Sequence, residues 1–184
     1  MTFMIVGLGN PGPEYKETRH NTGRLVLEHW RAAQSWPEWK FSAQTKALES
    51  RGRIGDETVT LLLPEGMMNK SGQSLKALAG KKKSLAQTIV VYDDLDLPFG
   101  KIKISFNRSS GGHRGLESVI KAVKSQEFIR LRVGIGLKKK PADVVKFILG
   151  RFTPAERVKL KKIIPAATQA LEQIIERGWL RAQV

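Results

Sequence analysis

A short apolar run closed by glycines and prolines opens the chain: residues 2–12 read TFMIVGLGNPG. Consecutive apolar residues bounded by turn residues are typical of a buried strand in a parallel sheet. The glycines and prolines that follow favour a rigid loop at the carboxyl end of that strand, which is where open α/β sheets place their sites. The segment therefore predicts a first strand at Thr2–Leu8 with a site loop directly after it.

The remaining hydrophobic pattern predicts that strands alternate with helices. Strands are expected at 47–54, 58–63, 88–92, 101–106 and 130–136, and helices at 22–34, 71–79, around 116–123 and from 154 towards 178. Gly55-Asp56 predicts a hairpin between the first two of these strands, and Pro165 is expected to kink or interrupt the last helix. We expect one α/β domain over residues 1–184, with a mixed, mostly parallel twisted sheet flanked by helices on both faces.

The charge balance points to a polyanionic partner. The 184 residues include 32 Lys and Arg against 17 Asp and Glu, which gives a formal net charge of +15 at pH 7. Nucleic acid is the commonest partner of so basic a domain. The absence of cysteine excludes disulfides, thiolate metal sites and a cysteine nucleophile. Because the N-terminus is unlike a secretory signal and no apolar run approaches about 18 residues, we expect a cytoplasmic protein without membrane contact.

The pattern GLGNPG at residues 7–12 matches the dinucleotide-binding fingerprint G-x-G-x-x-G. That fingerprint requires a helix that begins within the motif, so that its N-terminus meets the pyrophosphate. Here Pro11 and Pro13 favour a loop, and the next helix is expected only near Thr22. The motif therefore indicates a site loop without a dinucleotide, and a dinucleotide-dependent enzyme stays as a third hypothesis for the function.

The three histidines stand in different contexts. His20 lies between a loop and a helix start, where a neutral imidazole suits a general base; a structural role in bracing the loop is equally open. His29 falls on an amphipathic helix and is interpreted as a packed or edge residue. His113, in the glycine-rich stretch 111–115, is expected to be exposed and mobile. That stretch either presents backbone N–H groups to a phosphate or forms a flexible turn.

Three carboxylates follow the apolar strand at 88–92, namely Asp93, Asp94 and Asp96. They could bind a divalent metal ion, or one of them could orient a histidine, or all three could cap a turn before Pro98. Since they form an acidic cluster at a strand end in a very basic chain, we expect at least one of them to have a functional role.

Five ordered motifs together resemble those of bacterial peptidyl-tRNA hydrolases. They are Gly7–Gly12 with Glu14-Tyr15 and Thr18–Asn21, then Met68–Gly72, Asp93–Gly100, Gly111–Leu116 and Arg130–Gly136. Each motif alone is weak, but their order makes the resemblance specific, and it runs from about Val6 to about Phe152. It implies a monomeric carboxylic ester hydrolase of translation that cleaves the ester between a peptide and the 3′ end of tRNA.

The resemblance also implies roles for individual residues. His20 would activate water, and Asp93 would hold His20 in its basic form. Asn10 would contact the peptide side, while Asn69 would bind substrate and help orient water or support the oxyanion. The substrate-binding residues that the resemblance implies are Tyr15, Met67, Asn69, His113, Arg114 and Arg132. Ester hydrolysis of this kind needs a positioned base and neutral donors, so neither a metal ion nor an organic cofactor is expected.

Two departures from the family pattern concern charge. Arg114 stands where the family usually has asparagine, and a guanidinium adds a charge and cannot accept a hydrogen bond. Ser105 stands at a usually basic position, thought to hold the tRNA 5′ phosphate opposite Arg132. Arg108 or Lys103 could take over that task.

The main alternative is a non-catalytic RNA-binding protein on the same scaffold, such as a splicing or RNA-processing factor. Arg114 and the net charge of +15 fit this alternative. An intact pair of His20 and Asp93 fits it poorly, because RNA binding alone needs no general base.

Overall fold

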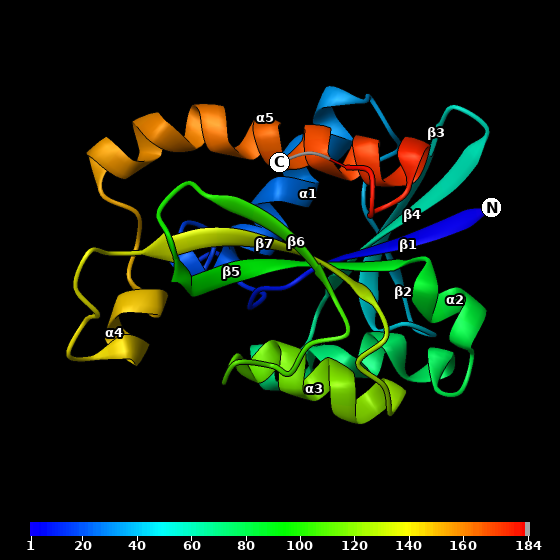
Figure 1. Ribbon diagram of the computed structural model, residues 1–184, viewed down its shortest axis with the longest axis horizontal. Helices are drawn as coiled ribbons and strands as arrows, with labels where there is room; N and C mark the ends of the chain where they lie inside the picture. Colours follow the sequence, from blue (N-terminus) through cyan, green and yellow to red (C-terminus); the bar gives the residue numbers. More distant parts are fainter. Residues whose placement is uncertain (183–184) are drawn as a thin grey trace.

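The computed structural model describes residues 1–182, and its centre is one seven-stranded sheet (Figure 1). The strands are β1 (Thr2–Gly7), β2 (Lys40–Ser42), β3 (Ala47–Ile54), β4 (Glu57–Pro64), β5 (Thr88–Pro98), β6 (Ile102–Phe106) and β7 (Ile129–Gly136). Their order in the sheet is β2-β3-β4-β1-β5-β7-β6. The four central strands run parallel, and β2, β3 and β6 add antiparallel edges. The predicted mixed sheet is confirmed.

Helices cover both faces of the sheet, as predicted (Figure 1). On one face lie α1 (Thr22–Ala33) and α5 (Pro154–Arg177); on the other lie α2 (Lys82–Ala86), α3 (Arg114–Val123) and the 3₁₀ helix η2 (Met68–Leu78). A 3₁₀ turn, η1 (Arg19–Asn21), precedes α1, and α4 (Val144–Leu149) stands beyond one end of the sheet. No helix within residues 1–182 is long and apolar enough to cross a membrane.

Each face of the sheet has its own buried core. Trp30 of α1 and Leu171 of α5 pack in the core of the first face, and Leu75 of η2 and Leu116 of α3 pack in the core of the second. Burial of such side chains is worth roughly 1.5–3 kcal/mol each, so the two layers hold the sheet rigid between them. A rigid sheet fixes the positions of the loops at its edges.

Three of the predicted elements take another form in the structure. The helix expected at 71–79 is the 3₁₀ helix η2, whose Gly72 packs directly against the backbone of α3. β5 continues past Tyr92 to Pro98 because it pairs with β7, so the three carboxylates lie within a strand and not after it. α5 passes Pro165 without interruption, since Leu160 and Leu171 bury its apolar face on both sides of the proline.

Two glycines allow α1 to approach the sheet at backbone distance. A Cβ atom on Gly23 would lie 2.2 Å from the Val91 carbonyl oxygen, and one on Gly7 would lie 2.5 Å from the Gly23 oxygen. Real Cβ atoms do not come so close, and only glycine fits here. The first glycine of the GLGNPG motif thus serves helix-to-sheet packing. No helix begins inside the motif, which ends seven residues before Arg19 starts η1.

The parallel central strands bring several site residues to one edge of the sheet. Asn10 follows the carboxyl end of β1, Met67 and Asn69 follow β4, and Asp93 lies in the second half of β5. Because β1, β4 and β5 run in the same direction, these carboxyl ends meet at one edge. The turn η1, directly before α1, brings His20 to the same edge, where it contacts Asp93.

Candidate active site

The centre of the site is the Asp93 carboxylate, which lies between two imidazole rings. Both of its oxygens are 3.0 Å from Nδ1 of His20, and Oδ1 is also 3.1 Å from Nε2 of His113. Asp93 is 3% exposed and His20 is 6% exposed, so water does not screen these contacts. The two rings lie 4.8 Å apart between centroids. The structure therefore brings together His20 and Asp93, as predicted, and adds His113 to the pair.

The hydrogen bonds of His113 determine which of its nitrogens carries the proton. His113 caps α3, because its Nδ1 accepts the backbone N–H of Leu116 at 3.3 Å. A nitrogen that accepts cannot carry a proton, so the neutral ring holds its proton on Nε2 and donates it to Asp93. The expectation that His113 is exposed and mobile was wrong, because the cap and the carboxylate hold the ring at both nitrogens. His29 is exposed on α1, so it is not packed in the core.

Two opposing effects act on the pKa of Asp93. Burial raises this pKa, but the charges and hydrogen bonds of His20 and His113 together lower it well below its usual range. The carboxylate of Asp93 is therefore ionised at neutral pH. An ionised acceptor favours the tautomer of His20 that carries its proton on Nδ1, which leaves Nε2 as the basic nitrogen.

The same three residues are spaced closely enough to hold a metal ion. The candidate ligand atoms of His20, Asp93 and His113 lie within 4.8 Å of one another, and no other such group occurs among residues 1–182. In the structure these atoms are hydrogen-bonded to each other, and an ion would have to replace both N–H protons. The residues suit base chemistry without an ion, and the expectation of a metal-free site stays a prediction.

Asn10 is fixed beside this centre by hydrogen bonds to two other segments. Its backbone N–H donates to Oδ1 of Asn21 at 2.8 Å, and its carbonyl accepts from Nδ2 of Asn21 at 2.9 Å. Its side-chain oxygen accepts the backbone N–H of Met68 at 2.7 Å. The side-chain oxygen of Asn10 is thus occupied by Met68. The amide NH₂ of Asn10 has no partner in the described part of the chain and is a free donor. Asn21 therefore braces the site loop and does not cap α1 through its side chain.

A cavity of about 340 Å³ opens beside His20, Asp93 and His113. Its lining includes the cationic residues Arg108, Arg130, Arg132 and Lys140 and residues 109–112. α4 contributes Val144 and Ile148 to the same lining. A cavity that joins basic side chains to a carboxylate–imidazole cluster suits an anionic substrate that undergoes base-catalysed chemistry.

Two arginines of β7 are held beneath this cavity in different ways. Nε of Arg132 donates to Oδ2 of Asp94 at 2.7 Å, which fixes the guanidinium at the cavity wall. Arg130 is 1% exposed and donates to the backbone carbonyls of Arg108 and Ser109. Burial raises the pKa of the neighbouring Tyr92 to about 12, although Arg132 and Arg130 oppose this shift, so its hydroxyl stays protonated. Because Tyr92 is neutral, it does not offset the positive charges of Arg130 and Arg132 at the floor of the cavity.

The structure distinguishes between the two substitutes for the basic residue that Ser105 replaces. Ser105 lies opposite Arg130 in the β6–β7 pairing, and its hydroxyl has no hydrogen-bond partner among the described residues. Arg108 lines the cavity with Arg132, whereas Lys103 is exposed on β6 outside the cavity lining. Of the two candidates, Arg108 is the one placed to act with Arg132.

The other predicted substrate residues lie outside the cavity. Asn69 and Arg114 line a separate groove between η2 and α3 with Lys70, Lys76 and Lys121. Met67 is 44% exposed at the start of η2, and Tyr15 is half-buried in the loop before η1. The sequence therefore predicted residues on two neighbouring surfaces: the cavity that holds the histidines and the η2–α3 groove.

Sequence reasoning missed several supporting residues. The bond from Asp93 to a second histidine, the Asn21 brace and the Arg132–Asp94 ion pair join segments 11 to 38 positions apart, and no local pattern reveals such pairings. Arg19 was also missed; its position directly before His20 was the available signal. The alternation of β7 placed Arg130 and Arg132 on one face, but their burial depends on the loop at 107–112.

Comparisons with known proteins agree with this geometry. A family profile described as peptidyl-tRNA hydrolase matches residues 4–184. A peptidyl-tRNA hydrolase of Aquifex aeolicus (strain VF5) is 42% identical over 186 residues, covering 94% of this chain and 90% of its own. One from Bacillus cytotoxicus is 40% identical over 179 residues, covering 97% and 95%.

A solved structure has the same fold. The Arg119Gln mutant of peptidyl-tRNA hydrolase from Acinetobacter baumannii superposes with a TM-score of 0.88 at 30% identity, over 98% of this chain and 92% of that one. A likeness at this level of identity and coverage extends to the whole sheet and the helices on both faces.

The hydrogen bonds predict opposite tautomers for the two histidines of the cluster. Above the pH at which both rings lose their charge, His20 should carry its proton on Nδ1 and His113 on Nε2, because each donates that proton to Asp93. Long-range ¹H–¹⁵N NMR of histidine-labelled protein distinguishes the two forms. The exposed His29 serves as an internal reference. A His113 ring protonated on Nδ1 would contradict the cap geometry.

Proposed function

The chain belongs to the peptidyl-tRNA hydrolase family, and from this membership we propose how its own side chains carry the reaction. The enzyme is a carboxylic ester hydrolase that acts on peptidyl-tRNA in translation. The comparisons give no support to the alternative of a non-catalytic RNA-binding factor.

His20 is the general base in this proposal. The observation that carries it is the pair of 3.0 Å contacts between His20 Nδ1 and the buried Asp93 carboxylate. With Nδ1 engaged, Nε2 takes a proton from water as the water oxygen attacks the ester carbonyl carbon. The tetrahedral intermediate then collapses, the bond to the ribose oxygen of tRNA breaks, and Nε2 returns its proton to that oxygen. Asp93 stabilises the imidazolium in between.

The two asparagines are the neutral donors in this proposal. The free amide NH₂ of Asn10 is rigidly aimed, since its oxygen accepts from Met68 N and its backbone is bonded to Asn21. We assign it to a carbonyl on the peptide side of the ester. Asn69 is exposed and lines the neighbouring η2–α3 groove, and we assign it to substrate binding and to support of the oxyanion. Preorganised donors of this kind typically contribute about 10²–10³ to a rate.

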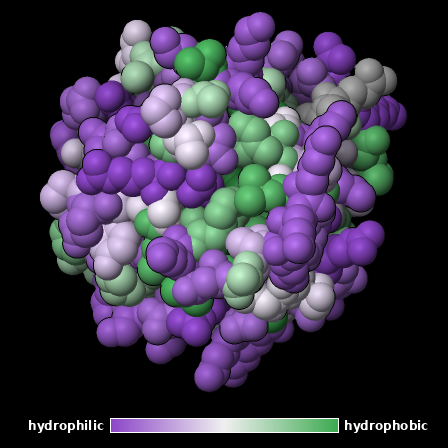
Figure 2. Space-filling model, turned by 90° about the vertical axis from the view of Figure 1, so that its left-hand side faces the viewer, coloured by the Kyte–Doolittle hydropathy of each residue, from purple (hydrophilic) through white to green (hydrophobic). Residues whose placement is uncertain are grey.

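The peptide and tRNA halves of the substrate are assigned to different surfaces. Tyr15 and Met67, at the outer edge of the site, are proposed to line the peptide cleft. His113 and Arg132 border the cavity and are proposed to contact the acceptor end of the tRNA. Figure 2 shows the face of the molecule at the α4 end. Apolar side chains lie in the middle of this face, and hydrophilic side chains surround them. Such a mixed surface suits a ligand that is part peptide and part RNA.

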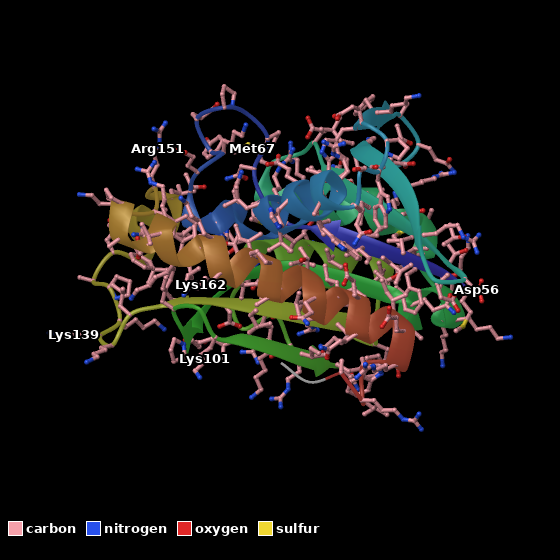
Figure 3. All side chains as sticks on the ribbon, turned by 90° about the horizontal axis from the view of Figure 1, so that it is seen from above. Asp56, Met67, Lys101, Lys139, Arg151 and Lys162 are labelled. Atoms are coloured by element: carbon pink, nitrogen blue, oxygen red, sulfur yellow. The ribbon has the colours of Figure 1, made fainter. Side chains whose placement is uncertain are left out.

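Four exposed basic side chains lie in the half of the molecule that holds the site. Lys101, Lys139, Arg151 and Lys162 lie in that half, while Asp56 lies at the opposite end (Figure 3). This distribution supports a phosphate footprint of tRNA on that end. We further propose that the chain works as a monomer in the cytoplasm, as a single domain over residues 1–184.

Replacing the base should abolish the reaction without unfolding the protein. His20→Ala should lower the single-turnover rate of peptidyl-tRNA hydrolysis by at least about 10²-fold, as expected for loss of a general base. Release of peptide from labelled peptidyl-tRNA measures the rate, and circular dichroism checks the fold. His29→Ala is the matched control, because His29 is exposed on α1 and should leave the rate unchanged. Turnover of His20→Ala near that of the wild type would refute the assignment.

Arg114 is expected to bind a phosphate near the tRNA acceptor end. It is exposed and lines the η2–α3 groove beside Lys70 and Lys121, outside the cavity where water would be activated. Arg114→Asn should therefore weaken tRNA binding and flatten the slope of log K against log salt by about 0.7, the value of one single-stranded phosphate contact. Lys124→Gln, at the end of α3 and outside the groove lining, is the control.

The rival interpretation makes the opposite prediction for Arg114. If the guanidinium has displaced a water-positioning asparagine, Arg114→Asn should raise the single-turnover rate at saturating substrate and leave the salt slope unchanged. Filter-binding titrations at several salt concentrations, run beside the hydrolysis assay, measure both quantities. A faster variant with an unchanged slope would overturn the phosphate assignment.

A further inference from the structure

Arg19, the residue directly before His20, is a buried guanidinium bonded to distant parts of the chain. Its side chain is 9% exposed. Nη2 donates to Oε2 of Glu156 at 2.7 Å, and Nη1 donates to the carbonyls of Phe147 and Gly150 at 3.2 and 3.3 Å. Its backbone N–H also donates to the Gly150 carbonyl at 3.1 Å. One side chain thus joins the turn of His20 to the carboxyl end of α4 and the start of α5.

Further contacts close the same junction. The guanidinium carbon lies 4.4 Å from the ring centre of Phe147 and 5.6 Å from that of Phe152. The backbone N–H of Phe152 donates to the Glu17 carbonyl, so the two segments also pair on either side of Arg19. A guanidinium can satisfy a carboxylate, two carbonyls and an aromatic face together because its donors lie in a rigid plane, which a lysine cannot reproduce.

Glu156 belongs to the junction and to α5 at once. Its carboxylate accepts the Thr153 N–H in the capping box that begins α5. Burial raises the pKa of Glu156, but the hydrogen bonds from Thr153 and Arg19 lower it to below its usual value. The acceptor of Arg19 is therefore charged, and charge-assisted hydrogen bonds are short and strong.

The elements that Arg19 joins both contribute residues to the lining of the cavity. The η1 turn contributes His20, with its ring held by Asp93, while α4 contributes Val144 and Ile148. A buried ion-pair network that touches both elements fixes the distance between them.

We propose that Arg19 is a positioning residue of the hydrolase: it holds the His20 turn and α4 in a fixed relation, so that Nε2 of His20 meets the water bound in the cavity. The proposal rests on the proposed function of His20. It requires that loss of the Arg19 contacts reduce the rate of the chemical step and loosen the His20–Asp93 bond, while tRNA binding through other basic residues persists.

The test compares Arg19→Gln with a matched control. Arg31→Gln removes another arginine of comparable burial, at the far end of α1, whose Nη1 bonds Glu38 at 2.9 Å and the Trp36 carbonyl at 3.0 Å. Arg19→Gln should lower the saturating single-turnover rate by about 10- to 100-fold, as small misplacements of reacting groups do. Affinity for deacylated tRNA should change by less than about threefold, since no phosphate contact is lost. Arg31→Gln should change neither quantity.

Conservative variants and a spectroscopic readout complete the test. Arg19→Lys, which keeps the charge but not the fork, and Glu156→Gln, which keeps a cap acceptor, should both give intermediate rates. If Arg19→Gln does not fold, Arg19→Lys and Glu156→Gln test the proposal in its place. The NMR signal of the His20 Nδ1–H proton should weaken in Arg19→Gln through faster exchange with water, and persist in Arg31→Gln.

The outcomes separate this proposal from the proposed function. A wild-type rate in Arg19→Gln, an equal loss in Arg31→Gln, or an unchanged His20 proton signal would each overturn the positioning role. An inactive wild-type protein would instead refute the function of the site, and the His20 proton signal would then decide the positioning role by itself.

Discussion

The buried carboxylate of Asp93 is the constraint on which the site depends. An isolated ionised carboxylate at 3% exposure would be very costly, and the two imidazoles at 3.0 and 3.1 Å offset that cost. In return, the charge fixes the proton of each ring and leaves Nε2 of His20 unprotonated, as the proposed role of a base requires. His113, held between its helix cap and Asp93, keeps the carboxylate from turning away. The cluster of Asp93, His20 and His113 therefore determines both the charge at the site and the ring nitrogen that is free to accept a proton.

The fold brings this cluster together through a backbone contact of α1 with the sheet. Gly7 and Gly23 let α1 touch the backbones of β1 and β5, and the turn that carries His20 consequently lies over Asp93. The parallel strands deliver Asn10 and Met68 to the same edge, where the hydrogen bond between them fixes the amide donor. Positioning in this site thus derives from sheet geometry and close helix packing.

The sequence predicted most of the fold and the contact between His20 and Asp93. Apolar runs such as 88–92 and the capping box at Thr153 are local signals for a strand and a helix start, and both elements form there. The expectation that Asp93 contacts His20 came from the family resemblance of the ordered motifs. The length of β5 and the 3₁₀ form of η2 were not predictable, because pairing with β7 and packing against α3 decide them. The fixed position of His113 was also missed, since its partner lies 20 residues away on another element.

The pH dependence of the chemical step in Asp93→Asn tests most directly the claim that Asp93 holds His20 as a base. The ionised carboxylate stabilises the protonated imidazole, so its removal should move the acid limb of the single-turnover rate profile to lower pH. The plateau rate should also fall, though less than in His20→Ala, because the tautomer of His20 is no longer enforced. An acid limb that stays in place or moves to higher pH would contradict direct coupling between Asp93 and the base.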